Sequence, residues 1–249
     1  QGTNTYLVGT GASRWLIDTG EGRREYVHLL RQAMEDEGVT GLEGILLTHH
    51  HGDHTGGLGD VRAMLKDMGV ESPVLAYKRI RRDHGERAVR THDNPGGDVD
   101  DPTRSRCYAA VADGAIFRCE GATIRALHTP GHTPDHVVFT LEEEGSMFAG
   151  DCVLNGNTAT FEDLGEYTES LKKMAQELPA GGTLYPSHGD VVTDGTNKLA
   201  EYLRHRAMRE EMFMDALRND WSTRPERGGM TASELCHAVY ARQVSYLVL

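Results

Sequence analysis

A dense histidine string, His49-His50-His51-Gly52-Asp53-His54, follows a short apolar run in this chain. It contains the pattern H-x-H-x-D-H, which is too rare at this composition to be expected by chance. Two histidines spaced by two in an extended loop can converge on one cation, and the Asp-His pair that follows can face a second cation. Neutral imidazoles and a carboxylate are the ligands expected for zinc. The string therefore predicts a metal site.

The rest of the chain repeats one local arrangement, in which a potential ligand closely follows a short apolar strand. His132, Asp151 and His188 all occupy such positions. Ligands at strand ends can gather at one edge of a sheet while the loops leave the metal open, so we expect these residues to meet the histidine string. With Asp151 bridging, each of two metals receives four protein ligands. The predicted sets are His49, His51, His132 and Asp151 for one metal, and Asp53, His54, Asp151 and His188 for the other.

Such a centre predicts a hydrolase. Two Zn²⁺ ions, two carboxylates and one hydroxide would leave a net charge of about +1, which suits stabilisation of an oxyanion. The predicted nucleophile is a metal-bridging hydroxide, because metal binding lowers the pKa of water from near 16 to about 7. It would attack a carbonyl carbon or a phosphorus, with Asp53 taking up the proton. Manganese or iron could occupy the same ligands in place of zinc.

Other residues near these positions are not predicted to be metal ligands. His50 points opposite to its two neighbours in an extended loop, so we expect it to face solvent or to lie behind the metal. Cys152 should point away from Asp151 as a buried thiol. His128 is expected to be packed, and His136 either packed or behind the metal.

The hydrophobic pattern supplies a scaffold in which strands and helices alternate over most of the chain. This predicts an α/β fold with a helical appendage. Residues 1–195 would form the catalytic domain, and 196–249 an incomplete C-terminal helical module with a capping box at 231–234. The predicted helices are 24–37, 57–68 and 162–178, and the predicted strands are 5–8, 15–18, 44–48, 74–77, 115–119, 123–128, 136–141, 147–149 and 183–185.

One segment, 78–106, loses the hydrophobic period and is predicted to be a loop or insertion. It carries an arginine run at positions 79, 81, 82, 87 and 90, but acidic residues interleave with it. A solvated loop is therefore a better interpretation than a track for RNA.

Composition narrows the classes of protein. The chain has 249 residues, of which 38% are hydrophobic, and a formal net charge of −12. It contains no run of 18 apolar residues, so no membrane span is predicted. The acidic charge argues against a general nucleic-acid coat. Four cysteines without a CxxC pair favour free thiols in a reducing intracellular compartment, mitochondrial or cytoplasmic. Because the chain begins at Gln1, we expect a trimmed sequence in which a targeting peptide would not be seen.

Four motifs together resemble the metallo-β-lactamase superfamily. They are the string at 48–57, the Pro-Gly-His-Thr turn at 130–133, Gly150-Asp151, and the Ser-His-Gly turn at 187–189. The resemblance implies a four-layer αββα sandwich with a dinuclear zinc site at one edge. It also assigns Asp18, in Leu-Ile-Asp-Thr-Gly, as a buried residue that orients the metal loop.

A closer similarity is to the lactamase-beta-like protein 2 group. It rests on residues 2–9, on 161–164, and on His205-Arg206 with Arg209-Glu210. In animals this group includes a mitochondrial single-strand-specific endoribonuclease, and related fungal enzymes of similar sequence hydrolyse polyketide thioesters on acyl-carrier proteins. The resemblance implies a C-terminal module of winged-helix type. It also favours a catalytic role for His205, although a histidine on an amphipathic helix is by default a surface or core residue.

The chain departs from this group just after Cys152. Residues 155–158 read Asn-Gly-Asn-Thr, where the group has Gly-x-Gly-Thr. That segment lies near the metals in the family, so Asn155, Asn157 and Thr158 are predicted to bind substrate.

Two substrates remain, because the same hydroxide can attack either kind of centre. The similarity to the animal proteins favours single-stranded RNA, which is the leading prediction, although the acidic charge leans weakly against it. The alternative is a thioester of an acyl-carrier protein, coenzyme A or glutathione type. A non-catalytic metal-bound module is disfavoured because every ligand is present, and no obligate protein partner is predicted.

Overall fold

The computed structural model of the chain describes residues 2–70, 74–79, 108–156 and 158–244, with side chains as far as residue 240. Two compact units, Gln1–Leu199 and Ala200–Leu249, make up the chain. The first unit holds both β-sheets and all of the predicted metal ligands.

The first sheet has the order β1-β2-β3-β4-β5. Its strands are β1 (Tyr6–Val8), β2 (Ser13–Ile17), β3 (Gly41–Leu46), β4 (Ala76–Lys78) and β5 (Tyr108–Ala110). β1 and β2 form an antiparallel hairpin, and β2 to β5 are parallel. Parallel strands end at the same edge, so the residues that follow β2, β3 and β4 are neighbours.

The second sheet has the order β10-β9-β8-β7-β6. Its strands are β6 (Ile116–Cys119), β7 (Ala122–His128), β8 (Val137–Leu141), β9 (Ser146–Gly150) and β10 (Leu184–Pro186). Neighbours in this sheet are antiparallel except β9 and β10. The end of β9, the end of β10 and the turn between β7 and β8 therefore share one edge.

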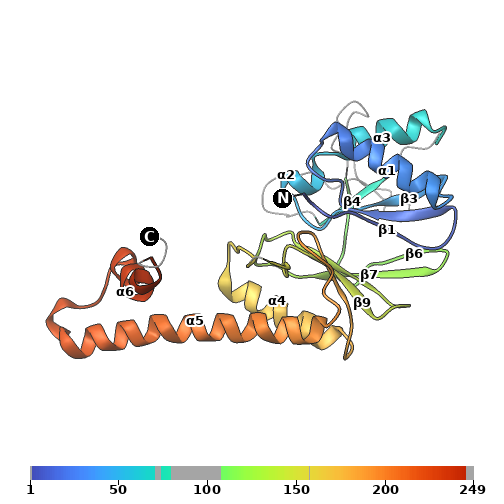
Figure 1. Cartoon of the computed structure of the whole chain (residues 1–249). Helices are drawn as coiled ribbons and strands as arrows, with labels where there is room; N and C mark the ends of the chain where they lie inside the picture. Colours follow the sequence, from blue (N-terminus) through green and yellow to red (C-terminus); the bar gives the residue numbers. More distant parts are fainter. Residues whose placement is uncertain (1, 71–73, 80–107, 157, 245–249) are drawn as a thin grey trace. The chain divides into compact units, whose positions relative to one another are not determined.

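Two hydrophobic layers hold the sandwich together. On β2, Leu16 packs into the core beneath the helices, whereas Trp15 and Ile17 pack between the sheets, as the two-residue period of a strand requires. Helices α1 (Arg24–Asp36) and α3 (Leu58–Asp67) cover the first sheet, and α4 (Leu164–Glu177) covers the second (Figure 1). The arrangement confirms the predicted αββα layers.

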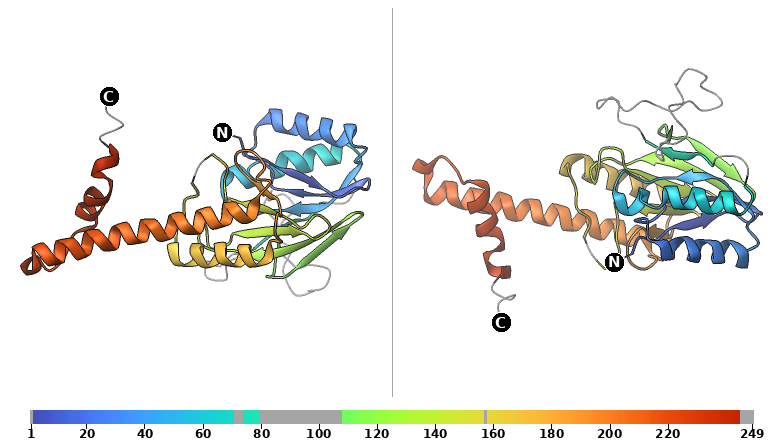
Figure 2. Two further views of the ribbon diagram at one scale, coloured as in Figure 1. Left: turned by 60° about the horizontal axis from the view of Figure 1, so that its bottom comes forward. Right: turned by 90° about the horizontal axis from the view of Figure 1, so that it is seen from above.

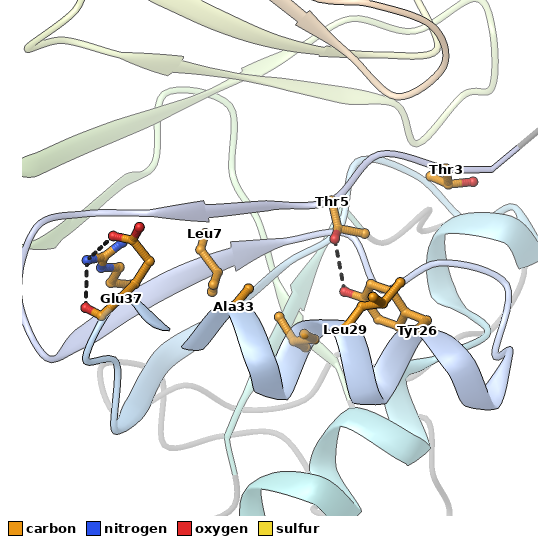
Figure 3. Close-up of a pocket in the computed structure, with 9 residues that line it drawn as sticks. Thr3, Thr5, Leu7, Tyr26, Leu29, Ala33 and Glu37 are labelled. Atoms are coloured by element: carbon orange, nitrogen blue, oxygen red, sulfur yellow. Dashed lines mark hydrogen bonds and ion pairs between the residues drawn. The ribbon is translucent and has the colours of Figure 1, made fainter. Parts of the chain in front are cut away.

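A groove of about 620 Å³ opens between α1 and β1, away from the inter-sheet core (Figure 3). Leu7, Leu29 and Ala33 line its apolar part. At one end the Tyr26 hydroxyl donates to Thr5 Oγ1 at 3.0 Å, and at the other Arg14 pairs with Glu37 at 3.4 Å. These contacts join the first helix to the first hairpin.

The second unit contains most of α5 (Gly195–Thr223), the short η2 (Pro225–Arg227) and α6 (Ala232–Val244), which Figure 2 shows from two further sides. The predicted capping box is confirmed: Glu234 N donates to Thr231 Oγ1 at 3.3 Å, and Thr231 N donates to Glu234 Oε2 at 3.0 Å. The part of this unit that the structure describes holds helices and no strand, so the wing of a winged-helix module is not seen there. Among the described helices, none is long and apolar enough to cross a membrane.

Beyond shifts of up to three residues in strand bounds, such as those of β2 and β3, three features differ from the sequence prediction. Lys78, which the sequence analysis assigned to the loop or insertion at 78–106, is the last residue of β4. Residues 80–107 lie outside the described part of the chain. The strand β5 follows that segment, and its short Tyr-Ala-Ala sequence carries no periodic signal. The one-turn helix α2 (Gly52–Thr55) forms inside the histidine string, where a turn leading into the helix at 57–68 was predicted. The predicted domain boundary at 195/196 stays a prediction.

Candidate metal centre

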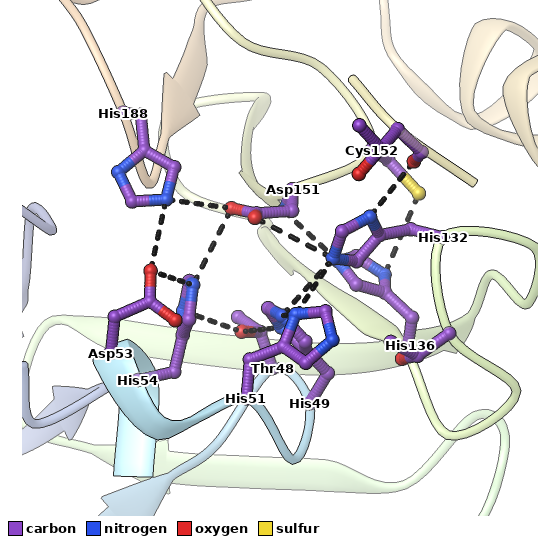
Figure 4. A network of polar contacts seen from close by, with 12 residues as sticks. Thr48, His49, His51, Asp53, His54, His132, His136, Asp151, Cys152 and His188 are labelled. Atoms are coloured by element: carbon purple, nitrogen blue, oxygen red, sulfur yellow. Dashed lines mark hydrogen bonds and ion pairs between the residues drawn. The ribbon is translucent and has the colours of Figure 1, made fainter. Parts of the chain in front are cut away.

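The sandwich brings all seven predicted ligands to one edge (Figure 4). The segment after β3 carries the histidine string, and α2 turns its last two members back towards the sheet. The second sheet contributes the remaining ligands from its strand ends and its β7–β8 turn. The predicted ligands form two groups: His49, His51, His132 and Asp151 in one, and Asp53, His54 and His188 in the other. A third possible group, His50, His51 and Glu162, shares His51 with the first and is otherwise exposed.

The first group places three ring nitrogens in a triangle. His49 Nε2 lies 2.9 Å from His51 Nδ1, and His132 Nε2 lies 3.2 Å from each of them. The other nitrogen of His132 donates to the Thr160 carbonyl at 2.9 Å, so His132 Nε2 carries a lone pair. A ring nitrogen has one proton or one lone pair, and three of them cannot satisfy three mutual hydrogen bonds. One cation between them would satisfy all three.

The second group sets ring nitrogens against carboxylate oxygens. His188 Nδ1 donates to the Gly2 carbonyl at 3.1 Å, which leaves His188 Nε2 facing Asp53 Oδ2 at 3.3 Å and Asp151 Oδ1 at 3.4 Å. His54 Nε2 lies 3.5 Å from the same two oxygens. Buried His54 Nε2 and Asp151 Oδ1 make no hydrogen bond. Unsatisfied buried atoms of this kind are costly unless a cation binds them, so the residues fit a divalent metal ion.

Asp151 stands between the two groups. Its Oδ2 faces His132 Nε2 at 3.5 Å, while its Oδ1 faces the histidines of the second group. One carboxylate oxygen is thus directed to each group, which is the geometry that the predicted bridging role requires.

The two groups shift the pKa values of their histidines in opposite directions. Burial, together with neighbouring imidazoles, lowers the pKa of His49 and of His51, so both are neutral and able to offer lone pairs. Burial also lowers the pKa of His54, but the carboxylates of Asp18, Asp151 and Asp53 outweigh it and raise this pKa to about 12. The Asp151 carboxylate beside the ring raises the pKa of His188. The second group therefore attracts positive charge, which a metal ion can supply in place of protons.

Asp18 supports the metal loop from beneath. It is 1% exposed and has a positive φ of 58°. Its Oδ1 accepts from Thr48 N at 2.9 Å, and its Oδ2 accepts from Thr48 Oγ1 and His54 Nδ1, both at 2.8 Å. The carboxylate holds the His54 ring by Nδ1 and so points Nε2 at the second group, which is the arrangement expected for a residue that orients a metal ligand.

We predict that Asp18→Asn weakens metal binding by about 10- to 100-fold. The asparagine amide would place donors opposite the Thr48 hydroxyl and His54 Nδ1–H, which are themselves donors. A competition titration with a chromophoric chelator measures the effect. Asp113→Asn, at an exposed ion pair with Lys173, is the matched control. Unchanged affinity in Asp18→Asn would contradict the assigned role.

His136 was left open by the sequence, and it lies directly behind Asp151. Its Nε2 accepts from the Asp151 backbone N–H at 3.0 Å, and its Nδ1 lies 2.9 Å from Thr129 Oγ1. Burial, above all, lowers the pKa of His136 to about 3, so this histidine is neutral. Cys152 is the expected buried thiol, and burial raises its pKa to about 12.

Helix α4 holds the two ligand-bearing segments of the second sheet in place. The Tyr167 hydroxyl donates to the Cys152 carbonyl at 2.6 Å, and Ser170 Oγ donates to the Pro130 carbonyl at 2.6 Å. Gly131, with a φ of 126°, lies so close to Tyr167 that a Cβ would come within 2.3 Å of its backbone. The glycine in the Pro-Gly-His turn is therefore required by both the backbone angle and the packing.

We predict that Tyr167→Phe destabilises the protein by about 1–3 kcal/mol, because it leaves the buried Cys152 carbonyl without its donor. Thermal or urea unfolding of the metal-free protein measures this loss. Thr168→Val removes a hydroxyl on the exposed side of the same helix and is the control. Equal stability of Tyr167→Phe and the parent would show that the hydrogen bond is not needed.

The remaining predicted residues are less closely tied to the centre. Asn155 is half-buried, and its backbone N–H donates to the His188 carbonyl at 3.2 Å. Thr158 is exposed, and Asn157 lies outside the described residues. His205 lies on the part of α5 that belongs to the second unit, half-buried, where burial and neighbouring arginines lower its pKa. The roles of these residues in binding or catalysis stay predictions.

Comparison with known proteins identifies the family. The model of the Metallo-beta-lactamase superfamily matches residues 1–194. The chain is 39% identical to the lactamase-like protein aptB of Emericella nidulans, covering 96% of this chain and 69% of that protein. It is also 39% identical to the atrochrysone carboxyl ACP thioesterase nsrC of Aspergillus novofumigatus, covering 98% of this chain and 67% of that one.

Solved structures agree with the fold. A metallo-beta-lactamase family protein from Thermus thermophilus superposes with a TM-score of 0.63 at 23% identity, over 86% of this chain and 78% of that one. A second protein, TTHA1623, solved in a di-iron-bound form, gives a TM-score of 0.54 at 26% identity, over 78% of this chain and 91% of that one. The sandwich, the clustered ligands and the family match lead to one conclusion: this chain belongs to the metallo-β-lactamase superfamily and is a metal-dependent hydrolase.

Proposed function

We propose that this protein is a dinuclear metal-dependent thioesterase that acts on a thioester carried by an acyl-carrier protein. The observation that carries the dinuclear proposal is the position of Asp151, whose two oxygens face two separate ligand groups. Histidine nitrogens and carboxylate oxygens suit zinc and also suit iron or manganese. We propose zinc, and the di-iron form of one structural relative makes iron the first alternative to test.

The proposed substrate rests on the relatives. Proteins named atrochrysone carboxyl ACP thioesterase align with nearly the whole chain at 37–39% identity. The chain spans about two thirds of their length. The RNA substrate that the sequence favoured has no such support, and the net charge of −12 disfavours a polyanionic partner. The thioester alternative is therefore the better interpretation.

The residues of the centre have distinct roles in the proposed reaction. Bound divalent ions would lower the pKa of a water molecule and polarise the thioester carbonyl. Asp53 is the accessible carboxylate, since 40% of its side chain is exposed against 11% for Asp151. The neighbouring His54 ring lowers the pKa of Asp53 to about 2, so this carboxylate is ionised at neutral pH. Thr3 Oγ1 donates to Asp53 Oδ2 at 3.4 Å and helps to orient it.

A side-by-side assay tests the proposal. We expect the zinc-loaded protein to hydrolyse an acyl thioester on an acyl-carrier protein, to act more slowly on the corresponding acyl-coenzyme A, and to leave a labelled single-stranded RNA intact. Chelation should remove the activity, and returning Zn²⁺ should restore it. Metal-dependent RNA cleavage without thioester hydrolysis would contradict the proposal and support the ribonuclease prediction.

A further inference from the structure

A buried lysine lies beside the metal centre without taking part in it. Lys78, at the end of β4, is 6% exposed. Its ammonium group lies 3.3 Å from Asp135 Oδ2 and 5.4 Å from the centre of the Tyr108 ring. Within the part of the chain that the structure describes, Asp135 is the acidic residue that pairs with Lys78. Removing both charges from water is costly, so stability alone is a weak reason for such a pair.

Asp135 also holds the metal-binding string. It is 2% exposed and belongs to the turn between β7 and β8, three residues after His132. Its Oδ1 accepts from His50 Nδ1 at 2.8 Å and from Thr133 Oγ1 at 2.8 Å. Its Oδ2 has the Lys78 charge opposite it but no hydrogen bond. One carboxylate therefore connects a strand end of the first sheet, the metal loop and the turn of the second sheet.

The connection joins the two halves of one metal site. His50 lies between the ligands His49 and His51 on the first-sheet side, while His132 comes from the second-sheet turn. A backbone hydrogen bond from Val137 to the Thr48 carbonyl, at 2.8 Å, already joins these segments at one point. The contact between His50 and Asp135 adds a second point, which restricts the rotation of one segment against the other.

Neighbouring charges and hydrogen-bond donors keep the Asp135 side chain ionised, as an acceptor of these hydrogen bonds must be. Burial alone would raise the pKa of the Asp135 carboxyl, but the hydrogen bond from His50, the Lys78 charge and the hydrogen bond from Thr133 lower it. In the second ligand group, His54 is supported by Asp18.

We propose that Lys78 and Asp135 are positioning residues that hold the histidine loop and the His132 turn in register for the first metal. This inference rests on the proposed dinuclear site and extends it to residues that no ligand pattern includes. A purely structural pair makes a different prediction, because apolar replacement of both members would then restore everything that a single replacement loses.

The test uses three variants: Asp135→Leu, Lys78→Met and the double variant. We expect each single variant to lower the unfolding temperature of the metal-free protein, because each leaves one buried charge unpaired. The double variant should recover most of this loss. The affinity of the double variant for Zn²⁺ at the first site should nevertheless stay at least about 10-fold weaker than that of the protein with both residues intact. This is the size of effect expected when a group that orients a metal ligand is lost.

Two backgrounds separate the sites. The His188→Ala substitution removes a ligand of the second site, so the tight Zn²⁺ binding that remains measures the first site. The His132→Ala substitution removes a ligand of the first site, so the binding that remains measures the second. Competition with a chromophoric chelator measures each affinity. The Zn²⁺ affinity of the second site should change by less than threefold in the double variant. Arg125→Met with Glu177→Leu removes an ion pair between β7 and α4 and is the matched control.

Each result decides the inference. A double variant that binds Zn²⁺ at the first site as tightly as its background would overturn it, and so would equal weakening of both sites or equal weakening in the control. If the parent protein binds two Zn²⁺ ions in these assays, such a failure concerns only the positioning role. If the parent binds no Zn²⁺, the proposed metal site itself fails.

Discussion

Asp151→Asn is expected to lower thioester hydrolysis by roughly 1,000-fold or more, the scale of losing an essential electrostatic group. The substitution removes the negative charge that both ligand groups share. It also turns an amide N–H₂ towards histidine nitrogens that now face carboxylate oxygens, so the amide protons would occupy the lone pairs of His54 or His188. We therefore expect the bound metal to fall from two ions per chain to one or fewer, measured by elemental analysis alongside initial rates.

Folding must be separated from metal loss in this experiment. Asp113→Asn again serves as the control, since that carboxylate pairs with Lys173 at the surface of the same unit. The far-ultraviolet circular dichroism of Asp151→Asn should match that of the parent. A variant that keeps two metal ions and more than a tenth of the parent rate would rule out the bridging role.

Asp53→Asn is expected to lower kcat by about 100- to 10,000-fold at saturating Zn²⁺, because an amide cannot accept the proton that a general base removes. The asparagine oxygen can still face the second metal, so part of the metal affinity should remain. We expect KM to change by less than threefold, since Asp53 is not assigned to substrate binding. Steady-state rates at increasing Zn²⁺ concentration measure both quantities.

The metal dependence of that variant separates the two roles of Asp53. If it acts only as a ligand, excess Zn²⁺ should restore the parent kcat in Asp53→Asn. If it also accepts the proton, kcat should reach a low plateau that more metal does not raise. Thr3→Val, which removes the hydroxyl that reaches Asp53 Oδ2, should give a smaller loss and serves as a graded comparison.

The sequence predicted the scaffold well where burial leaves a periodic signal. Helix α1 begins at the predicted residue, and β7 and β8 lie within one residue of their predicted bounds. Prediction failed for β5, which has only three residues, and for α2, whose single turn is imposed by the loop around it. Short elements of this kind are stabilised by their neighbours rather than by their own sequence.

The candidate metal site was also predicted only in part from the sequence. The residues of the two candidate groups could be named from the sequence because each is a histidine or aspartate placed soon after a strand. The groups that orient them could not, since a link such as Lys78 to Asp135 joins positions far apart in the chain and depends on which strand ends meet. His136 carried a visible signal, a second histidine in the Pro-Gly-His turn region, but only the structure shows its contact with the Asp151 backbone.

The most direct test of the account is a metal reconstitution curve. Metal-free protein would receive Zn²⁺ in known equivalents, and hydrolysis of an acyl-carrier-protein thioester would be measured at each step. A dinuclear thioesterase predicts negligible activity without metal and a rise that levels at two equivalents per chain. Full activity in the metal-free protein, or a plateau at one equivalent, would contradict it.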